Sequence, residues 1–135
     1  VQKKPNAKSC VLQISAPNRS ALLAGDIEAA QELRLVGAGA AALQADVLLV
    51  PHHGSKTSSS APFLDAASPR FALVQAGYRN RFGHPAAMVM DRYTSRGIVV
   101  HDSVHCGAAT WSSAEPTKVQ CERDRSPRYW QHVPP

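Results

Sequence analysis

The chain has 135 residues, a formal net charge of +5 and a sequence pI near 9.5. With 44% hydrophobic residues it is too apolar to be disordered, and it is too long for a disulfide-stapled mini-protein. The longest apolar run, residues 35–43, is shorter than the ~20 residues that span a bilayer, and no apolar signal-peptide segment opens the chain. We therefore expect a single soluble, basic domain.

Positive charge gathers in three places along the sequence. These are an N-terminal, a central and a C-terminal group: Lys3, Lys4 and Lys8; Arg79, Arg81 and Arg92; Arg123, Arg125 and Arg128. Such a surplus favours polyanionic partners, although solubilising chain ends have the same composition. The three cysteines form no CxxC motif. Cys106 and Cys121 can pair in an oxidising compartment, a choice that the sequence leaves open.

A hairpin and a helix are predicted at the start of the chain. Residues 9–16 and 21–24 have the composition of two strands, joined by a four-residue turn at 17–20. A helical pattern follows and ends at Gly37 and Gly39. Its expected apolar face consists of residues at helical spacing, Ile27, Ala30, Leu33 and Val36.

Buried strands and helices alternate in the rest of the chain. Strands are expected at residues 46–50, 71–76 and 98–100, and helices at 61–67 and 86–95, the last with Met88, Met90 and Tyr93 available for packing. Two further strands are expected at 108–111, as the hairpin partner of 98–100, and at 117–121. This alternation is typical of an α/β fold in which helices pack on a sheet.

Three polar segments share one place in this pattern, just after the C-terminal end of an expected strand. Asp26 follows the hairpin, His52 and His53 follow the next strand, and His84 follows the strand after that. In an α/β sheet, strand ends on one side form the crevice where ligands bind. If the strands are parallel neighbours, a carboxylate and three imidazoles meet there. Such nitrogen and oxygen ligands indicate a metal or phosphate site.

Each of these residues also has an interpretation that involves no site. Asp26 can cap the helix that follows it, His84 can cap the helix begun by Pro85, and loop histidines are often only solvated. The loop at residues 54–58 can offer hydroxyls and the Lys56 ammonium to a phosphodiester, or be a flexible connection. It lacks the GxxxxGK[ST] spacing of a nucleotide-binding loop.

A second group, His101-Asp102-Ser103-Val104-His105, also resembles a set of metal ligands. It falls in an expected hairpin connection, where alternating strand geometry would not bring both histidines and the carboxylate to one face. We therefore do not assign it to the site.

Four segments together resemble one protein family. They are LLAGDIEAAQE, ADVLLVPHHGSKTSSS, FALVQAGYRNRFGHP and a later RY…G, within residues 6–111. In this combination they resemble the C-terminal metallo-β-lactamase-like domain of the DNA-internalisation competence protein ComEC family, and CERDRSPRYWQH is similar to the end of that channel protein. The resemblance implies an α/β fold, the metallo-β-lactamase-like αββα sandwich, and a di-metal phosphodiesterase ancestry.

The resemblance also implies roles for single residues. Asp26 resembles the carboxylate that bridges two metal ions, and His84 resembles the last metal-binding histidine. His52 and His53 resemble the histidines beside the scissile phosphate, which act as a further ligand or as a general acid. Four residues would then contact phosphate: Ser55, Lys56, Arg79 and Asn80.

One departure from the family pattern is large. The principal metal signature, HxHxDH, is absent, and no His-x-His occurs anywhere in the sequence. We therefore expect residues 1–122 to be only the second half of the sandwich, followed by a basic, proline-containing tail at 123–135. A divalent metal, Zn²⁺ or Mn²⁺, is expected in the complete domain, with none necessarily bound by this segment alone. We expect the segment alone to be inactive as a nuclease or phosphodiesterase.

The family further implies partners and a compartment. The partners would be single-stranded DNA, the remainder of a membrane channel, and a second copy of the chain bound through an exposed sheet surface. The parent is expected in the bacterial inner membrane, with this domain on the periplasmic rather than the cytoplasmic side. Two other functions stay open: a non-catalytic module that binds DNA or a protein partner, and a hydrolase acting on a small phosphodiester or thioester.

Overall fold

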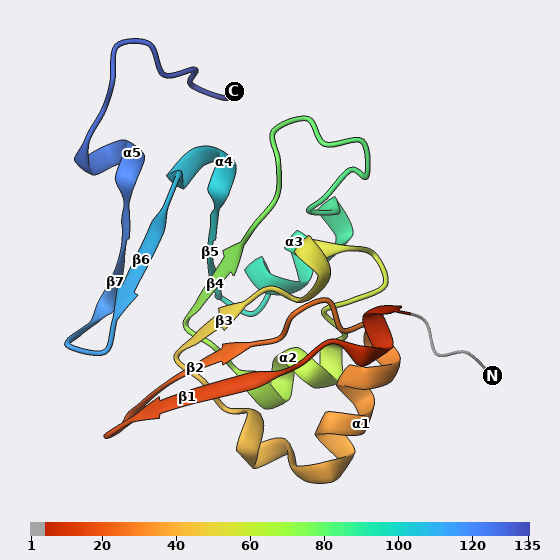
Figure 1. Cartoon of the computed structure of the whole chain (residues 1–135). Coiled ribbons are helices and arrows are strands. Elements are labelled where there is room, and N and C mark those ends of the chain that lie inside the picture. Colours follow the sequence, from red (N-terminus) through yellow and green to blue (C-terminus); the bar gives the residue numbers. More distant parts are fainter. Residues whose placement is uncertain (1–4) are drawn as a thin grey trace.

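The computed structural model describes residues 5–135, so the expected basic group at Lys3 and Lys4 lies outside the described residues. It contains a five-stranded mixed sheet in the order β1-β2-β3-β4-β5 (Figure 1). β1 and β2 are antiparallel, and β2 to β5 run parallel to one another. The strands span Leu12–Ala16, Arg19–Leu23, Val47–Leu49, Phe71–Val74 and Val99–Asp102. The predicted α/β class is confirmed.

Helices join the strands. The α-helices α1 to α5 span Ala29–Gly39, Ala61–Ala67, Ala87–Thr94, Ser103–Cys106 and Glu122–Arg125. Short 3-10 helices span Pro5–Lys8, Ala40–Leu43 and Pro51–Gly54. Within residues 5–135, no helix combines the length and the apolar composition needed to cross a bilayer.

The core lies between the sheet and its helices. Leu22, Leu48 and Ala72 are partners in register across β2, β3 and β4 and therefore point to the same face. They are fully buried in one cluster with Phe63 of α2 and Tyr93 of α3. Burial of these apolar side chains is the main favourable term that holds the helices on the sheet.

The opposite face of the sheet is also apolar but is covered differently. Leu12 and Ile14 of β1 and Val99 of β5 point to it, and all three are about half exposed. Near β5 this face is approached by a separate hairpin, β6 (Ala109–Ser112) and β7 (Glu115–Cys121), which lies apart from α1, α2 and α3 (Figure 1). The two faces are therefore unequal in cover although both are apolar.

The first hairpin and α1 differ from the prediction in detail. The turn consists of Pro17 and Asn18 rather than four residues, because Asn18 adopts the left-handed conformation that a tight turn needs. The helix begins at Ala29, where a capping box between Glu28 and Gln31 closes its first turn, and it continues through Gly37.

The predicted inner face of α1 was correct only in part: Ile27, just before the helix, is buried, and Val36 packs against the core. Ala30 and Leu33 are exposed, and the charged Glu32 is fully buried instead. The reason is that Glu32 has specific hydrogen-bond partners on the opposite loop, which hydrophobic periodicity does not detect. Met88 of α3, expected to pack, is likewise exposed.

The C-terminal strands pair differently from the prediction. β5 does not form a hairpin with residues 108–111; it adds in parallel to β4, which places Val100 against the helix-covered core. β6 pairs with β7 instead. A disulfide between Cys106 and Cys121 ties this hairpin to the end of β5 through α4.

Candidate metal and phosphate site

The predicted meeting of polar side chains at one edge of the sheet is confirmed in position. β2, β3 and β4 are parallel neighbours, and their C-terminal ends lead to Asp26, to His52 and His53, and to the loop that carries His84. The ring centroids of His52 and His84 lie 5.8 Å apart, and those of His52 and His53 lie 6.3 Å apart. The Nε2 atom of His53 is 3.5 Å from Oδ1 of Asp26.

An unusual backbone presents the two adjacent histidines. His52 and His53 both have positive φ, 48° and 56°, a conformation that costs a non-glycine residue about 1–2 kcal/mol. Gly54 follows with φ 78°, and a Cβ there would lie 2.7 Å from Cβ of Pro85. The Gly54 carbonyl accepts a hydrogen bond from the Ala86 N–H at 2.9 Å. The loops after β3 and β4 are thus in direct contact, and strained backbone of this kind is concentrated at functional sites.

The hydrogen bonds of His53 define its chemistry. Its Nδ1 lies 2.7 Å from the carbonyl oxygen of Gln75, so Nδ1 must carry the proton and donate it. In the neutral ring, Nε2 then bears a lone pair, and this lone pair faces the Asp26 carboxylate. Two electron-rich atoms that face each other are stabilised by a cation between them, either a proton on Nε2 or a metal ion.

His52 is held by a different set of partners. Its Nε2 lies 3.4 Å from the Asn6 amide nitrogen, which can only donate. Its Nδ1 lies 3.4 Å from the Thr57 hydroxyl and 3.7 Å from Oε1 of Glu28. Asn6 also donates to Glu28 at 2.9 Å. Glu28 is a second carboxylate beside the site that the sequence analysis missed, because its helix-capping position concealed it.

His84 has the least satisfied ring of the group. Its Nδ1 is buried and has no hydrogen-bond partner among the described residues. Burial, with the nearby His52 and His53, lowers the pKa of His84 below 6.5 and so favours the neutral ring. A cavity of about 290 Å³ opens beside it, and its lining includes His53, Asn80 and Phe82. A neutral imidazole with a free lone pair is the form that binds a metal.

The expected phosphate contacts divide into two kinds. Lys56 and Arg79 are exposed and free to meet an anion. Ser55 is buried, and its hydroxyl lies 3.1 Å from that of Thr57. The Asn80 amide donates to the carbonyls of Gly77 and His84 and accepts from the His84 N–H, which uses its donors. In this structure Ser55 and Asn80 therefore shape the loops rather than face solvent.

The two capping interpretations do not hold. Glu28, not Asp26, caps α1, and Asp26 instead donates its N–H to the Ser9 hydroxyl at 2.8 Å. α3 begins at Ala87 with Ala86 as its cap, so His84 does not cap it. Both side chains are left available at the strand ends.

Glu32 fixes the loop that follows the two histidines, and sequence reasoning missed it. Its carboxylate accepts the N–H groups of Ser59 and Ser60 at 2.6 and 2.7 Å. Arg92 donates to the carbonyls of Ser58 and Ser59, and the Tyr93 hydroxyl lies 2.9 Å from that of Ser59. Burial raises the pKa of Tyr93, which keeps this hydroxyl protonated. The 54–58 loop is consequently packed at its far end rather than loose.

Asp26 and His53 are close enough to share a metal ion, but in the described chain the wider group of histidines and carboxylates does not form a compact set of ligands. Carboxylate oxygen and imidazole nitrogen suit Zn²⁺ or Mn²⁺, and the Asp26–His53 pair and the unpartnered His84 nitrogen offer such donors. Within residues 5–135, however, only one set of three candidate ligand atoms lies within 4.8 Å of one another, and it is His101, Cys106 and Cys121.

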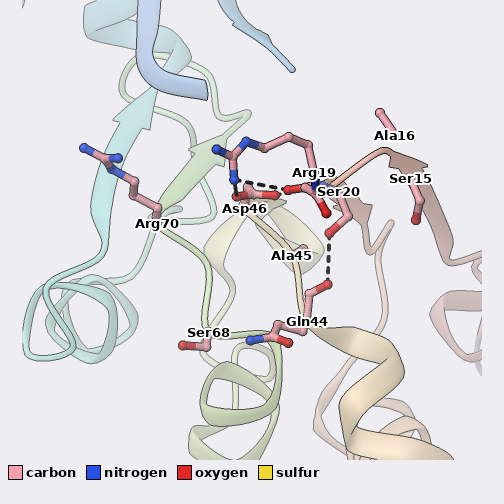
Figure 2. A pocket seen from close by; sticks show the side chains of 10 residues that line it. Ser15, Ala16, Arg19, Ser20, Gln44, Ala45, Asp46, Ser68 and Arg70 are labelled. Carbon is pink, nitrogen blue, oxygen red and sulfur yellow. Dashed lines mark hydrogen bonds and ion pairs between the residues drawn. The ribbon is translucent and has the colours of Figure 1, made fainter. Parts of the chain in front are cut away.

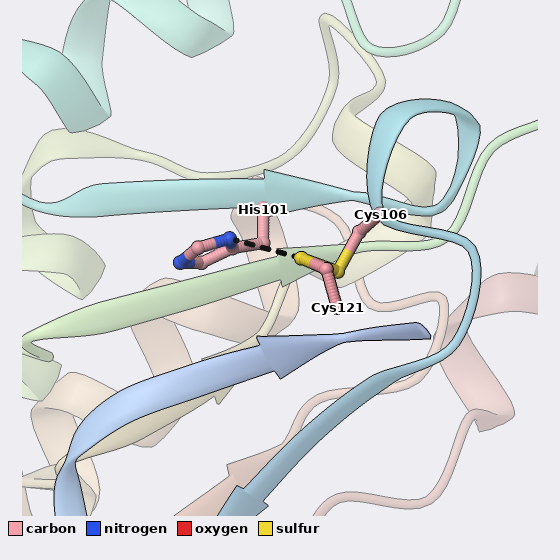
Figure 3. A group of neighbouring side chains, drawn as sticks. All are labelled: His101, Cys106 and Cys121. Carbon is pink, nitrogen blue, oxygen red and sulfur yellow. Dashed lines mark hydrogen bonds between the residues drawn. A yellow bond between two sulfur atoms is a disulfide. The ribbon is translucent and has the colours of Figure 1, made fainter. Parts of the chain in front are cut away.

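That second set is occupied by a covalent bond. Figure 3 shows Cys106 and Cys121 joined as a disulfide, with Nδ1 of His101 3.7 Å from the Cys121 sulfur. Disulfide sulfurs are not thiolates and do not serve as zinc ligands. His105 points elsewhere, with Nδ1 2.8 Å from the Asp102 carboxylate that caps α4. His101 and His105 thus contact different partners, so residues 101–105 do not form one ligand set, as the sequence predicts.

A larger cavity, of about 450 Å³, lies at the opposite ends of the same strands (Figure 2). Three of its polar side chains bind one another or the nearby backbone. Asp46 accepts the Ser20 N–H at 2.8 Å and lies 3.4 Å from the Arg19 guanidinium, and the Ser20 hydroxyl donates to the Gln44 carbonyl. These contacts link the starts of β2 and β3.

Comparison with known proteins places this chain in a family. No protein-family model matches the chain. It is 38% identical over 130 residues to Competence protein ComA of Neisseria gonorrhoeae and 36% identical over 95 residues to ComE operon protein 3 of Bacillus subtilis. The chain is a ComEC-family domain.

The relatives are much longer than this chain. The two alignments cover 96% and 70% of the chain but only 19% and 12% of the relatives. Uncharacterized protein YcaI of Escherichia coli is 35% identical over 96% of the chain and 17% of its own length. The chain therefore spans less than a fifth of the length of these relatives, one of which is named as a competence protein.

Proposed function

We propose that this ComEC-family domain is part of a metal-dependent phosphodiesterase or nuclease that processes DNA during uptake. The observation that carries the proposal is the pairing of the His53 Nε2 lone pair with the Asp26 carboxylate at 3.5 Å, beside the unpartnered ring nitrogen of His84. A divalent cation bound between these atoms would be stabilised by the carboxylate and the ring nitrogens. Such a cation supplies an activated water and neutralises charge on a phosphodiester.

The chain's own residues have separable roles in this proposal. Asp26, His53 and His84 would hold the metal. The Gln75 carbonyl fixes the His53 tautomer, which keeps Nε2 directed at Asp26. His52 lies between Asn6 and Thr57, and it would exchange one of these contacts to donate a proton to a leaving oxygen. Lys56 and Arg79 are exposed cations that suit the flanking phosphates.

The site is proposed to be completed by residues outside this segment. The HxHxDH signature is absent from the sequence, and the half-exposed apolar face formed by Leu12, Ile14 and Val99 suits a second sheet. Both observations support the αββα sandwich with one half missing, and both favour weak hydrolysis by this chain alone. In the absence of that half, the same face can also associate with a second copy.

A periplasmic position is supported by the Cys106–Cys121 disulfide. Structural disulfides persist in oxidising compartments and are rare in the cytosol. The net charge of +5 and the exposed arginines suit a DNA partner, which is also consistent with the competence names of the relatives.

Metal titration tests the proposal. Histidine ring signals are followed by NMR while Zn²⁺ or Mn²⁺ is added to the chain. We expect the signals of His53 and His84 to respond together. In Asp26→Ala the apparent metal affinity should fall about 10- to 100-fold. Asp46→Ala, at the opposite end of the strands, serves as the matched control and should behave as wild type.

A second candidate function is a non-catalytic module that binds DNA or a protein partner. It is favoured by the spread of the donor atoms, since Asp26, His53 and His84 form no compact ligand set within residues 5–135. If no histidine responds to metal, and single-stranded DNA binds equally well with and without chelator, the module replaces the enzyme. Robust cleavage of a phosphodiester that is lost in Asp26→Ala contradicts the proposed incompleteness of the site.

A further inference from the structure

Exposed aromatic side chains are confined to two segments of the described chain. Among large hydrophobic residues that are well exposed, the aromatic ones are Tyr78, Phe82, Tyr129 and Trp130. The first two belong to the loop between β4 and α3, and the others to the tail after α5. Phe82 is 66% exposed and Trp130 is 64% exposed, which is unfavourable for a ring in water unless it has a partner.

The two segments lie side by side. Figure 1 shows the tail returning toward the loop that rises from β4. The rings of Tyr78 and His132 have centroids 5.0 Å apart, and Arg123 donates to the His132 carbonyl at 3.1 Å. Aromatic residues that are about 50 positions apart in sequence therefore belong to one surface.

Each of three rings on this surface is accompanied by an arginine. The guanidinium carbons lie over the rings at 5.2 Å for Arg79 and Tyr78, 4.8 Å for Arg81 and Phe82, and 5.6 Å for Arg128 and Trp130. In the described part of the chain, none of these arginines forms an ion pair with a carboxylate. We call Tyr78, Phe82 and Trp130 the aromatic strip. Its charge is positive and uncompensated.

The aromatic strip leads to the histidine site. Phe82 stacks on His84 with centroids 5.7 Å apart and planes 20° apart. Phe82 and His84 also line the same cavity as His53. A polymer that runs along the aromatic strip therefore arrives at the rings of His84 and His53.

We propose that the aromatic strip is a stacking platform for the bases of single-stranded DNA. On binding, Arg79, Arg81 and Arg128 leave the ring faces that they cover in the free chain and hold the phosphates. Rings alternating with cations are the combination by which proteins bind single strands without reading their sequence. A duplex does not fit, because its bases are already stacked inside the helix and offer no free faces. This proposal rests on the proposed function in one respect only, namely that the bound strand is led to the metal site at His53 and His84.

The test compares two probes on two proteins. The probes are a fluorescein-labelled 20-residue oligo(dT) and a strand of equal length that is abasic over its central part. Affinities of the 135-residue chain are measured by fluorescence anisotropy with chelator present, so that hydrolysis plays no part. The variant carries Tyr78→Leu, Phe82→Leu and Trp130→Leu, which preserve apolar bulk and remove the rings.

We expect the wild type to bind oligo(dT) at least about tenfold more tightly than the abasic strand, since stacking on even one ring gives roughly fivefold or more. The triple variant should bind both probes alike, at the affinity of the abasic strand. Tyr78→Phe is the matched control, because it keeps the ring and should keep the preference. Arg79→Gln with Arg81→Gln should reduce the salt dependence of both probes instead.

An unchanged preference for oligo(dT) in a folded triple variant, verified by circular dichroism, overturns the aromatic strip. So does duplex DNA that binds as tightly as oligo(dT) and weakens equally in the variant. These outcomes are independent of metal binding. If metal titration fails but the preference for oligo(dT) is intact, the proposed metal chemistry is wrong and the proposed stacking on the aromatic strip stands. If metal binds but the preference for oligo(dT) is absent, only the proposed stacking is wrong.

Discussion

The two ends of the parallel strands contrast in how their polar groups are satisfied. At the N-terminal ends, the larger cavity of about 450 Å³ is bordered by Arg19, Asp46 and Ser20, which bind one another. At the C-terminal ends, the smaller cavity of about 290 Å³ is bordered by His53 and His84. Nδ1 of His53 is bonded to the Gln75 carbonyl and its Nε2 faces Asp26, whereas Nδ1 of His84 has no hydrogen-bond partner among the described residues. The larger cavity therefore lies at one end of the strands, and the histidine ring nitrogen without a hydrogen-bond partner in the described chain lies at the other end.

The contrast shows how the C-terminal end keeps its groups available. The Gln75 carbonyl orients the ring of His53, and the buried Glu32 holds the loop that follows the two adjacent histidines. The supporting contacts are made by backbone and by residues that do not face the cavity, which leaves Nε2 of His53 facing Asp26 and Nδ1 of His84 without a hydrogen-bond partner within residues 5–135. At the other end the lining residues are themselves the support.

The largest expected effect compares the two supporting carboxylates. Glu32→Ala leaves the buried Ser59 N–H and the partly buried Ser60 N–H without acceptors, and should lower the free energy of unfolding by about 3 kcal/mol or more. Asp46→Ala removes a partly exposed pair and one backbone contact, and should lower it by about 1 kcal/mol. Urea denaturation measures both.

Arg34→Ala, on the exposed side of α1, is the control for Glu32 and should change stability by less than about 0.5 kcal/mol. Equal losses for Glu32→Ala and Asp46→Ala would contradict the idea that the C-terminal end depends on buried support.

The intermediate effect compares two glycines near the site. Gly54→Ala places a methyl group 2.7 Å from Pro85 in a left-handed backbone, so both strain and a clash oppose it. Gly83→Ala has a similar φ of 65° but open space around the new methyl. We expect losses of stability of about 2–3 and about 1 kcal/mol, respectively. If thermal unfolding shows the two to be alike, the contact between the β3 and β4 loops is not tight.

The smallest effect concerns His105 of α4, the helix that follows β5. Its hydrogen bond to Asp102 raises the pKa of His105 above 6.5 in the folded chain. The associated stabilisation is therefore present below pH 6.5 and is lost as the pH rises through the raised pKa. Asp102→Asn should return the pKa toward 6.5, as followed by NMR, whereas Asp91→Asn should not. A raised pKa that persists without Asp102 would assign the shift to another neighbour.

Much of the sheet is predictable from sequence because buried parallel strands have continuous apolar runs. Residues 46–50 and 71–76 contain β3 and β4, and residues 61–67 coincide with α2. From the polar residues that end these runs, the position of Asp26 and of the three histidines at one edge follows. Hairpin partners are harder, because strand pairing depends on which neighbour buries Val100, and a local pattern does not contain that information.

The supporting residues of the site were the part that sequence could not supply. Glu32 interrupts an apolar helix face, and only its distance to Ser59 and Ser60 explains why a carboxylate is buried there. Asn80 and Ser55 have side chains suited to phosphate, but the structure uses them for the backbone of their own loops. Residue type indicates what chemistry is possible, whereas tertiary contacts determine which groups remain free.

The strand order of the sheet has a consequence for folding. Because β1 to β5 are adjacent in space in the same order as in sequence, each strand pairs with a neighbour that is synthesised immediately before or after it. Each parallel pair is therefore joined by a single crossover, and no strand has to insert between two strands that are already paired. The β6–β7 hairpin stands outside this sheet, and the Cys106–Cys121 disulfide fastens it to the end of β5 through α4.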